Sequence, residues 1–253
     1  MADHTIFTPF FLDESLPGLE PAYQPQWQRN QPPLPEGGQQ QRMAAIYEPL
    51  ARAVAAAIDR GERPVSVAGD CCATLGMLAG LQRAGVDPQL IWFDAHGDFN
   101  TPETSPSGFL GGMPLAMLVG RGDLTMPNAL NLKPLPENQV ILTDARDLDP
   151  GERELVEQAS IIHLKSAHDL LRFPLSGRPI YIHFDVDILD PQEAPAMSYP
   201  VPGGISAEDL RTVFARLMDT NQVAAVSMSC WNPAVAGADK TRQICMGVFS
   251  ALL

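Results

Sequence analysis

The chain of 253 residues is longer than most single domains but ordinary for one α/β domain, so we expect a single domain over residues 1–253. Its 17 Lys and Arg residues against 30 Asp and Glu residues give a formal net charge of −13. This charge excludes functions that depend on attraction to phosphates, so no nucleic acid or anionic membrane is expected as a partner. With 45% hydrophobic and 19% charged residues, the composition is too apolar for a disordered chain.

The cysteines and the N-terminal segment favour a reducing compartment. Four cysteines, of which Cys71 and Cys72 are adjacent, are too sparse for a disulfide framework in a chain of this length. The first residues carry Asp3 before their apolar stretch and Pro9 within it, and they lack the basic region of a signal peptide. No apolar run approaches the roughly 18 residues of a membrane span. We therefore expect a cytoplasmic protein.

Short β-rich runs alternate with longer segments of helical spacing. The expected strands cover residues 5–11, 64–70, 89–94, 139–145, 160–164, 179–187 and 223–230. The expected helices cover residues 43–60, 73–84, 112–119, 151–158, 166–172 and 206–219. This alternation predicts an α/β fold with a parallel sheet. Residues 16–42, rich in Pro, Gln and Gly, are expected to form a long surface loop, either a passive connection or a lid.

Acidic residues follow two of the expected strands. The run 89–94 leads into Asp94, His96 and Asp98, which alternation places on one side if the chain stays extended. The run 179–187 ends in Asp185 and Asp187. Because ligands of open parallel sheets bind beyond the carboxyl ends of the strands, we expect these five side chains to meet at one site.

Buried carboxylates repel one another and lose hydration unless protons or cations compensate them. Either motif alone is explained by a turn at the end of a strand. Two motifs on separate strands of one sheet, one of them with an imidazole, instead indicate a metal cluster. Oxygen ligands with one imidazole suit a divalent ion such as Mn²⁺, and bridging carboxylates hold two ions about 3.5–4 Å apart.

A cysteine pair follows the run 64–70 at the same edge of the sheet. Cys71 is a candidate thiolate ligand, provided that a metal keeps it deprotonated, and Cys72 is the alternative if the register differs by one residue. Without the acidic motifs, either cysteine would be read as a small apolar core residue.

The motifs and their order resemble those of the ureohydrolase family, which contains the arginases and agmatinases. The resemblance covers about residues 64–240, and its most specific segment runs from Asp94 to Asn100, with Asp147, Asp149 and Glu152 later in the chain. It implies a three-layer α/β/α fold with a parallel sheet, arginase-like, and a binuclear manganese site that hydrolyses guanidino groups.

Individual roles follow from matching positions in the family pattern. The resemblance implies that Asp94, His96, Asp98, Asp185 and Asp187 bind metal, and that Asp98 accepts a proton from the attacking water. It also assigns a small-molecule amino-acid substrate, whose α-carboxylate would be held by three residues and whose α-amino group by one. These are Asn100, Ser105 and Ser107 for the carboxylate, and Asp149 for the amino group.

Three positions depart from the arginase pattern. Cys71 replaces a ligand His, Gly111 replaces the proton-shuttle His, and Cys230 replaces the Glu that pairs with the guanidinium. A buried guanidinium stays charged, since its pKa is above about 12, and it requires that carboxylate. An N-hydroxyguanidine is far less basic and can bind neutral. The sequence therefore most resembles the branch with a Cys ligand, typified by Nω-hydroxy-L-arginine hydrolase.

Two other functions stay open at this point: a formimino or amidine C–N hydrolase of the same fold, and a non-catalytic binding homologue. A homo-oligomer is possible, since the family contains monomers and trimers. We expect His183 to have a hydrogen-bonded role beneath Asp185 rather than to bind metal. His163 and His168 are weaker candidates for a replacement proton shuttle.

Overall fold

The computed structural model describes residues 1–229 and 231–253. An eight-stranded sheet has the order β4-β1-β5-β10-β9-β6-β7-β8, and its neighbouring strands are parallel. Its strands are β1 (Asp3–Thr8), β4 (Gln28–Arg29), β5 (Arg63–Ala68), β6 (Gln89–His96), β7 (Val140–Asp147), β8 (Ile162–Leu164), β9 (Ile180–Asp185) and β10 (Val223–Ser229). A separate antiparallel hairpin joins β2 (Phe10–Phe11) and β3 (Glu14–Ser15).

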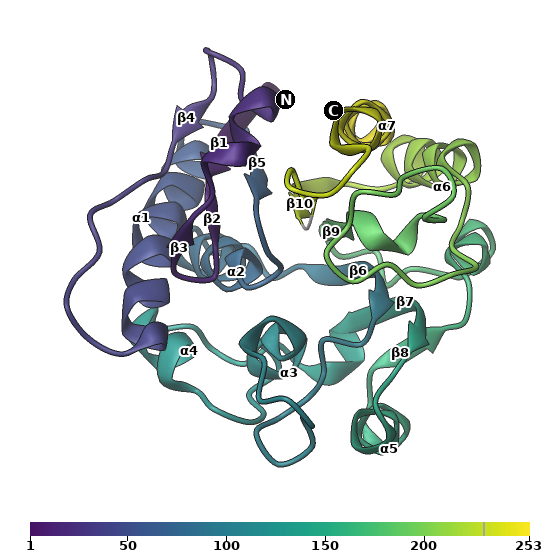
Figure 1. The fold of residues 1–253 in the computed structure, drawn as a ribbon, viewed down its shortest axis with the longest axis horizontal. Helices are drawn as coiled ribbons and strands as arrows, with labels where there is room; N and C mark the ends of the chain where they lie inside the picture. The colour runs from purple at the N-terminus through teal and green to yellow at the C-terminus, as the bar shows by residue number, and fades with distance from the viewer. Residues whose placement is uncertain (230) are drawn as a thin grey trace.

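Helices cover both faces of the sheet, which confirms the predicted three-layer α/β/α fold (Figure 1). One hydrophobic cluster contains buried residues of α1 (Gln39–Asp59), α2 (Ala73–Arg83), α3 (Pro114–Leu118), α4 (Thr125–Ala129) and α5 (Pro150–Gln158). A second cluster contains those of α6 (Ala207–Thr220) and α7 (Ala238–Phe249). The central strands β5, β6, β9 and β10 are almost completely buried between these layers, as their apolar sequences predict.

The expected loop 16–42 is more ordered than its composition suggests. It contains a 3-10 helix at Pro17–Ala22 and the edge strand β4. The first helix begins at Gln39 rather than at residue 43 because Gln41 Oε1 accepts the Gly38 N–H at 3.0 Å and so caps the first turn. Gln39, Gln40 and Gln41 therefore form the first turn of α1.

Two helices were not predicted, and one expected α-helix has a different form. Residues 166–172 form a 3-10 helix at Ala167–Leu171, which begins with the side chain of Ser166 accepting the His168 N–H. The unpredicted α7 starts after Gly237, which has a φ of 86°, and it has no side-chain cap for a sequence pattern to detect. The unpredicted α4 spans only five residues. No helix in the described parts of the chain is long and apolar enough to cross a membrane.

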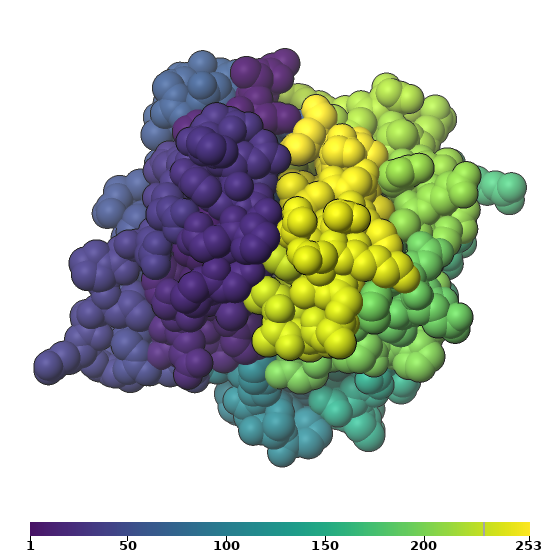
Figure 2. Space-filling model, turned by 45° about the horizontal axis from the view of Figure 1, so that its top comes forward, coloured from purple at the N-terminus to yellow at the C-terminus, as the bar shows by residue number. Residues whose placement is uncertain are grey.

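The two ends of the chain lie on the same face of the molecule. Figure 2 shows the N-terminal region beside the C-terminal helix. Leu19 and Trp27 share a hydrophobic cluster with Cys245 and Phe249 of α7. The N-terminal segment therefore completes the same core layer as the last helix.

Candidate metal centre

Neighbouring strands bring the predicted ligands to one edge of the sheet. The order β5-β10-β9-β6 places the carboxyl ends of these four strands side by side. Cys71 follows β5, Asp94 and His96 lie at the end of β6, and Asp185 ends β9. Asp187 lies in the 3-10 turn after β9. The fold therefore brings these five side chains together at one edge of the sheet.

The ligand atoms form two groups that share one carboxylate. Cys71, Asp94 and Asp185 make the first group, and Asp94, His96 and Asp187 make the second, with ligand atoms within 4.8 Å of one another in each. Cys71 Sγ lies 2.8 Å from Asp185 Oδ2, and His96 Nδ1 lies 3.0 Å from Asp187 Oδ2. A carboxylate common to two groups is the geometry of a binuclear metal site.

Backbone and indole N–H groups fix the carboxylates. Asp94 Oδ1 accepts the His96 N–H at 2.7 Å, and Asp94 Oδ2 accepts Nε1–H of Trp92 at 2.9 Å. Asp187 Oδ1 accepts the Ala95 N–H at 3.1 Å, and Asp185 Oδ1 accepts the Asp187 N–H at 2.9 Å. These neutral donors orient the carboxylates but do not neutralise their negative charge. A cation bound among them would neutralise it.

Asp98 reaches the site by a turn and not by strand alternation. The strand β6 ends at His96, its register with β7 shifts after Asp94, and Asp98 has a φ of 48°. The expectation of an extended chain through Asp98 is therefore wrong, although Asp98 still lines the same cavity as His96 and Asp187. It belongs to neither three-ligand group, and its Oδ2 is buried with no hydrogen-bond partner among the described residues.

The electrostatics of the cluster indicate a missing positive charge. Burial and the nearby Asp187 raise the pKa of Asp94 to about 6, and burial with the charges of Asp94 and Asp185 raises the pKa of Asp98 well above its ordinary value. Burial alone would lower the pKa of His96, but its bonds to Asp187 and Asp94 outweigh this and raise it to about 12. In the absence of metal, an imidazolium proton compensates the carboxylates; metal ions would replace that proton.

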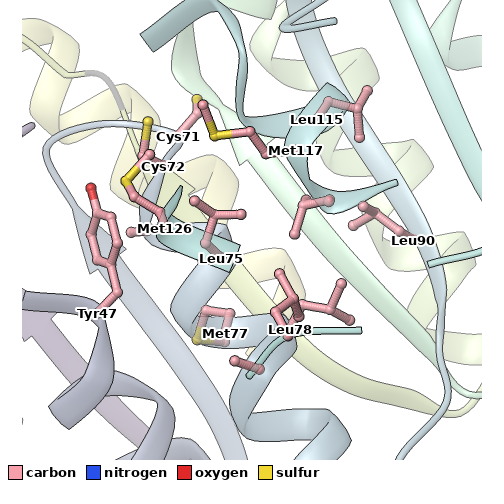
Figure 3. Close-up of a cluster of buried hydrophobic side chains, with 14 of the residues drawn as sticks. Tyr47, Cys71, Cys72, Leu75, Met77, Leu78, Leu90, Leu115, Met117 and Met126 are labelled. Carbon is pink, nitrogen blue, oxygen red and sulfur yellow. The ribbon is translucent and has the colours of Figure 1, made fainter. Parts of the chain in front are cut away.

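The donor set fits a binuclear metal centre. Four buried carboxylates, one imidazole and one thiol converge at the site. Asp98 Oδ2 is buried and has no hydrogen-bond partner in the described part of the chain, so a cation would satisfy it. Among the described residues Cys72 belongs to neither ligand group, and its Sγ lies 3.6 Å from the carbonyl oxygen of Leu110. Figure 3 shows both cysteines at the end of the hydrophobic cluster near Tyr47 and Leu75. The register of the chain after β5 therefore favours Cys71 over Cys72 as the candidate thiolate ligand.

His183 lies beneath the cluster of candidate ligands, two residues before Asp185 on β9. Its Nε2 is 3.2 Å from Cys71 Sγ, and its Nδ1 is 2.8 Å from Ser227 Oγ. Burial lowers the pKa of His183 to about 3, so the ring is neutral. Neither His163 nor His168 lines the cavity; their ring nitrogens instead contact the Asp144 carbonyl and Ser166.

A cavity of about 230 Å³ opens over the cluster. The four residues assigned to the amino-acid end of the substrate all line it, namely Asn100, Ser105, Ser107 and Asp149. Asn100 Nδ2 donates to Asp149 Oδ2 at 3.0 Å, so two of them already form one polar group. Cys230, predicted at the other end of the substrate, lies outside the described residues.

Sequence reasoning did not identify the aromatic wall of the cavity. Phe11, Phe109 and Tyr199 line it, and the ring centroids of Phe109 and Tyr199 are 5.4 Å apart. A β-carbon on Gly111 would lie 2.4 Å from the Phe109 ring. These aromatic residues belong to no sequence motif, so only the folded structure shows that they line the site.

Glu152 belongs to the family pattern, but the sequence alone indicates no role for it. It is 3% exposed, and its Oε1 accepts the Phe99 N–H at 2.8 Å while its Oε2 accepts the Asp149 N–H at 3.3 Å. Burial raises its pKa to about 7. The signal that could have found it is the capping box at the start of α5, in which Asp149 is the N-cap residue and Glu152 is N3.

Comparisons with known proteins agree with this geometry. The family model "Arginase family" matches residues 33–253. Arginase from Bacillus subtilis (strain 168) is 33% identical over 219 residues, which cover 81% of this chain and 74% of the relative. Arginase from Bacillus caldovelox is 31% identical over 225 residues, which cover 83% and 75%. The native structure of the latter matches with a TM-score of 0.86 and 25% identity over 100% of this chain and 98% of the other.

Two groups of possible metal ligands at the carboxyl edge of a parallel sheet are typical of metal-dependent hydrolases with an α/β fold. The match over residues 33–253, with relatives more than 30% identical over about four-fifths of the chain, makes the class more specific. The chain belongs to the arginase family, so it is a hydrolase that acts on guanidino or amidine groups.

Proposed function

We propose that this protein is a di-manganese hydrolase that cleaves the guanidino C–N bond of an arginine-derived amino acid, Nω-hydroxy-L-arginine. One observation carries the proposal: the two ligand groups sharing Asp94 adjoin a cavity whose lining includes the polar pair Asn100 and Asp149. The site thus combines a hydrolytic centre with a clamp for a zwitterion. We also propose that it acts in the cytoplasm as the single domain 1–253.

Cys71, Asp94, His96, Asp98, Asp185 and Asp187 would hold the two ions. When bound, the ions lower the pKa of water and so supply a nucleophile at neutral pH. Asp98 lines the cavity, and its carboxylate oxygen that does not bind an ion would accept the proton of that water. Water adds to the guanidino carbon as the bond to the δ-nitrogen breaks, and the products are ornithine and hydroxyurea.

The amino-acid end of the substrate would lie against Asn100, Ser105, Ser107 and Asp149. The short polar side chains donate to the α-carboxylate, and Asp149 binds the α-amino group. Ser105 and Ser107 already accept the backbone N–H groups of Gly108 and Phe109, at 3.0 and 3.2 Å, so their hydroxyl protons are available to a carboxylate. A substrate without an α-carboxylate would leave these donors unused.

Two features support a substrate that is neutral at its distal end. Cys230 stands where the family resemblance places a carboxylate for a guanidinium, and Gly111 stands where it places a proton-shuttle His. The ring of Phe109 lies where a side chain at position 111 would enter. Burying a guanidinium without its carboxylate costs several kcal/mol, whereas a neutral hydroxyguanidine avoids that cost.

The experiment is a product assay with metal analysis. The protein purified with Mn²⁺ is tested on Nω-hydroxy-L-arginine, L-arginine, agmatine and formimino-glutamate, and ornithine, urea and hydroxyurea are measured. The proposal predicts two metal ions per chain and release of hydroxyurea. Faster turnover of formimino-glutamate would indicate the other C–N hydrolase, and metal binding without any turnover would indicate a binding homologue.

A further inference from the structure

A line of buried polar side chains runs inward from the metal cluster. Cys71 Sγ is 3.2 Å from His183 Nε2, His183 Nδ1 is 2.8 Å from Ser227 Oγ, and Ser227 Oγ is 2.8 Å from Tyr181 Oη. All four residues are buried. His183 and Ser227 are direct neighbours in the β9–β10 register, so the sheet itself fixes this line.

The chemistry of the sulfur decides the direction of these hydrogen bonds. A metal-bound thiolate has no proton to donate, so in the 3.2 Å contact between Cys71 Sγ and His183 Nε2 the hydrogen must be on the imidazole nitrogen. Nδ1 is then an acceptor and takes the hydroxyl proton of Ser227. The Ser227 oxygen in turn accepts from Tyr181 Oη. Each contact along this line then joins one donor to one acceptor, and such a chain of satisfied hydrogen bonds is rigid.

We propose that His183 is a positioning residue that donates its Nε2–H to the Cys71 sulfur and holds that sulfur toward Asp94 and Asp185. The inference rests on the proposed function, since Cys71 must be a metal ligand. A hydrogen bond to the sulfur lowers the electron density that the thiolate gives to the metal, so His183 also tunes the ion's power to polarise water. Trp92 packs against the ring, with centroids 4.1 Å apart, and fixes its orientation.

The test uses Co²⁺, whose bond to a thiolate gives a charge-transfer band in the near ultraviolet. The matched variants are His183→Asn and His183→Gln. The Asn amide reaches Ser227 but is too short for Cys71, whereas the Gln amide nitrogen reaches the Nε2 position. We expect His183→Asn to move the band to longer wavelength and to weaken Co²⁺ binding about 10- to 100-fold. His183→Gln should restore both toward the parent.

Controls separate this inference from the metal-site assignment. A parent protein without the band, or a band that survives Cys71→Ser, would show that Cys71 is no ligand and would contradict the proposed function. A band present in the parent but unchanged in His183→Asn would overturn the role of His183 alone. Ser229 Oγ is also 3.1 Å from the sulfur. If the charge-transfer band shifted in Ser229→Ala but not in His183→Asn, the role proposed for His183 would also be overturned.

A measurement on the unaltered protein covers the case in which the Asn variant does not fold. The parent is loaded with diamagnetic Cd²⁺, and the tautomer of His183 is read from ring ¹⁵N chemical shifts. The proposal predicts the Nε2–H tautomer. The Nδ1–H tautomer would leave no hydrogen between His183 and the sulfur and would refute the proposal.

Discussion

The ring of Phe109 fills the space beside Gly111, because a β-carbon built on Gly111 would lie 2.4 Å from Cε1 and Cζ of that ring. Gly112, the next residue, has nothing within 4 Å of its β-carbon position. We expect Gly111→Ala to displace Phe109 and lower the free energy of unfolding by about 1 kcal/mol. Gly112→Ala should be neutral or slightly stabilising. Denaturant unfolding of both variants checks this; equal stabilities would contradict it.

The same relationship predicts how a proton shuttle can be installed. Gly111→His alone should be blocked from the cavity by Phe109, so it should not raise kcat/KM for arginine. The double variant Gly111→His with Phe109→Ala makes room for the imidazole and should raise it. The Phe109→Ala single variant is the control. A higher kcat/KM for arginine in Gly111→His alone would contradict this prediction, because it would show that the Phe109 ring does not block the imidazole.

Removing the Cys71 thiol should weaken binding of one of the two metal ions. Cys71→Ser is expected to reduce the metal content measured by elemental analysis from two ions toward one per chain, because the first ligand group loses its sulfur. Cys245→Ala is the matched control, since Cys245 is a buried thiol in α7. Cys72→Ala should also keep both ions because its Sγ faces the Leu110 carbonyl. Full metal content in Cys71→Ser would reject the ligand assignment.

Losing the charge at Asp149 should weaken binding of the α-amino group. Asp149→Asn keeps a side-chain oxygen for the cap of α5 but removes the carboxylate. A hydrogen bond to a charged group contributes about 1.5–3 kcal/mol, so kcat/KM should fall about 10- to 100-fold. The melting temperature serves as the control and should change little. An unchanged kcat/KM would place the amino group elsewhere.

The metal-free protein should become less stable as the pH rises. Burial raises the pKa of Asp94 from 3.8 to about 6 and that of Glu152 from 4.5 to about 7. Between pH 4 and 7 these two carboxyls therefore bind more protons in the folded than in the unfolded state, and we expect this to outweigh the opposite effect of His183, whose pKa burial lowers from 6.5 to about 3. The free energy of unfolding then falls across that window. Mn²⁺ should offset the loss, since it binds the deprotonated ligands. Chemical unfolding of both forms at pH 5 and pH 8 tests this, and a metal-free protein more stable at pH 8 would contradict it.

The sequence predicted the parts of the site that lie on strands. Asp94, His96 and Asp185 are at the ends of adjacent parallel strands, where alternation and the edge of the sheet determine their positions. His183 was placed correctly for the same reason, two residues before Asp185 on one strand. Periodicity is reliable there because the hydrogen-bonded sheet leaves each residue one of two directions.

The sequence did not predict features that depend on loops and on contacts between distant segments. Asp98 enters by a left-handed turn, which a non-glycine residue rarely adopts and which no pattern announces. Phe11 and Phe109 meet at a ring distance of 6.3 Å from positions almost a hundred residues apart. The start of α7 at Gly237 has no side-chain cap. Tertiary packing decides these features, and local residue types do not encode it.

The most direct test of the proposed function is the ratio of kcat/KM for Nω-hydroxy-L-arginine to that for L-arginine, measured with Mn²⁺ in the parent and in Cys230→Glu. We predict that the parent strongly prefers the hydroxylated substrate, and that Cys230→Glu shifts the ratio toward arginine because it supplies a partner for the guanidinium. A parent that hydrolyses arginine as efficiently as hydroxyarginine would show that the substrate need not be neutral at its distal end and would refute the proposed function.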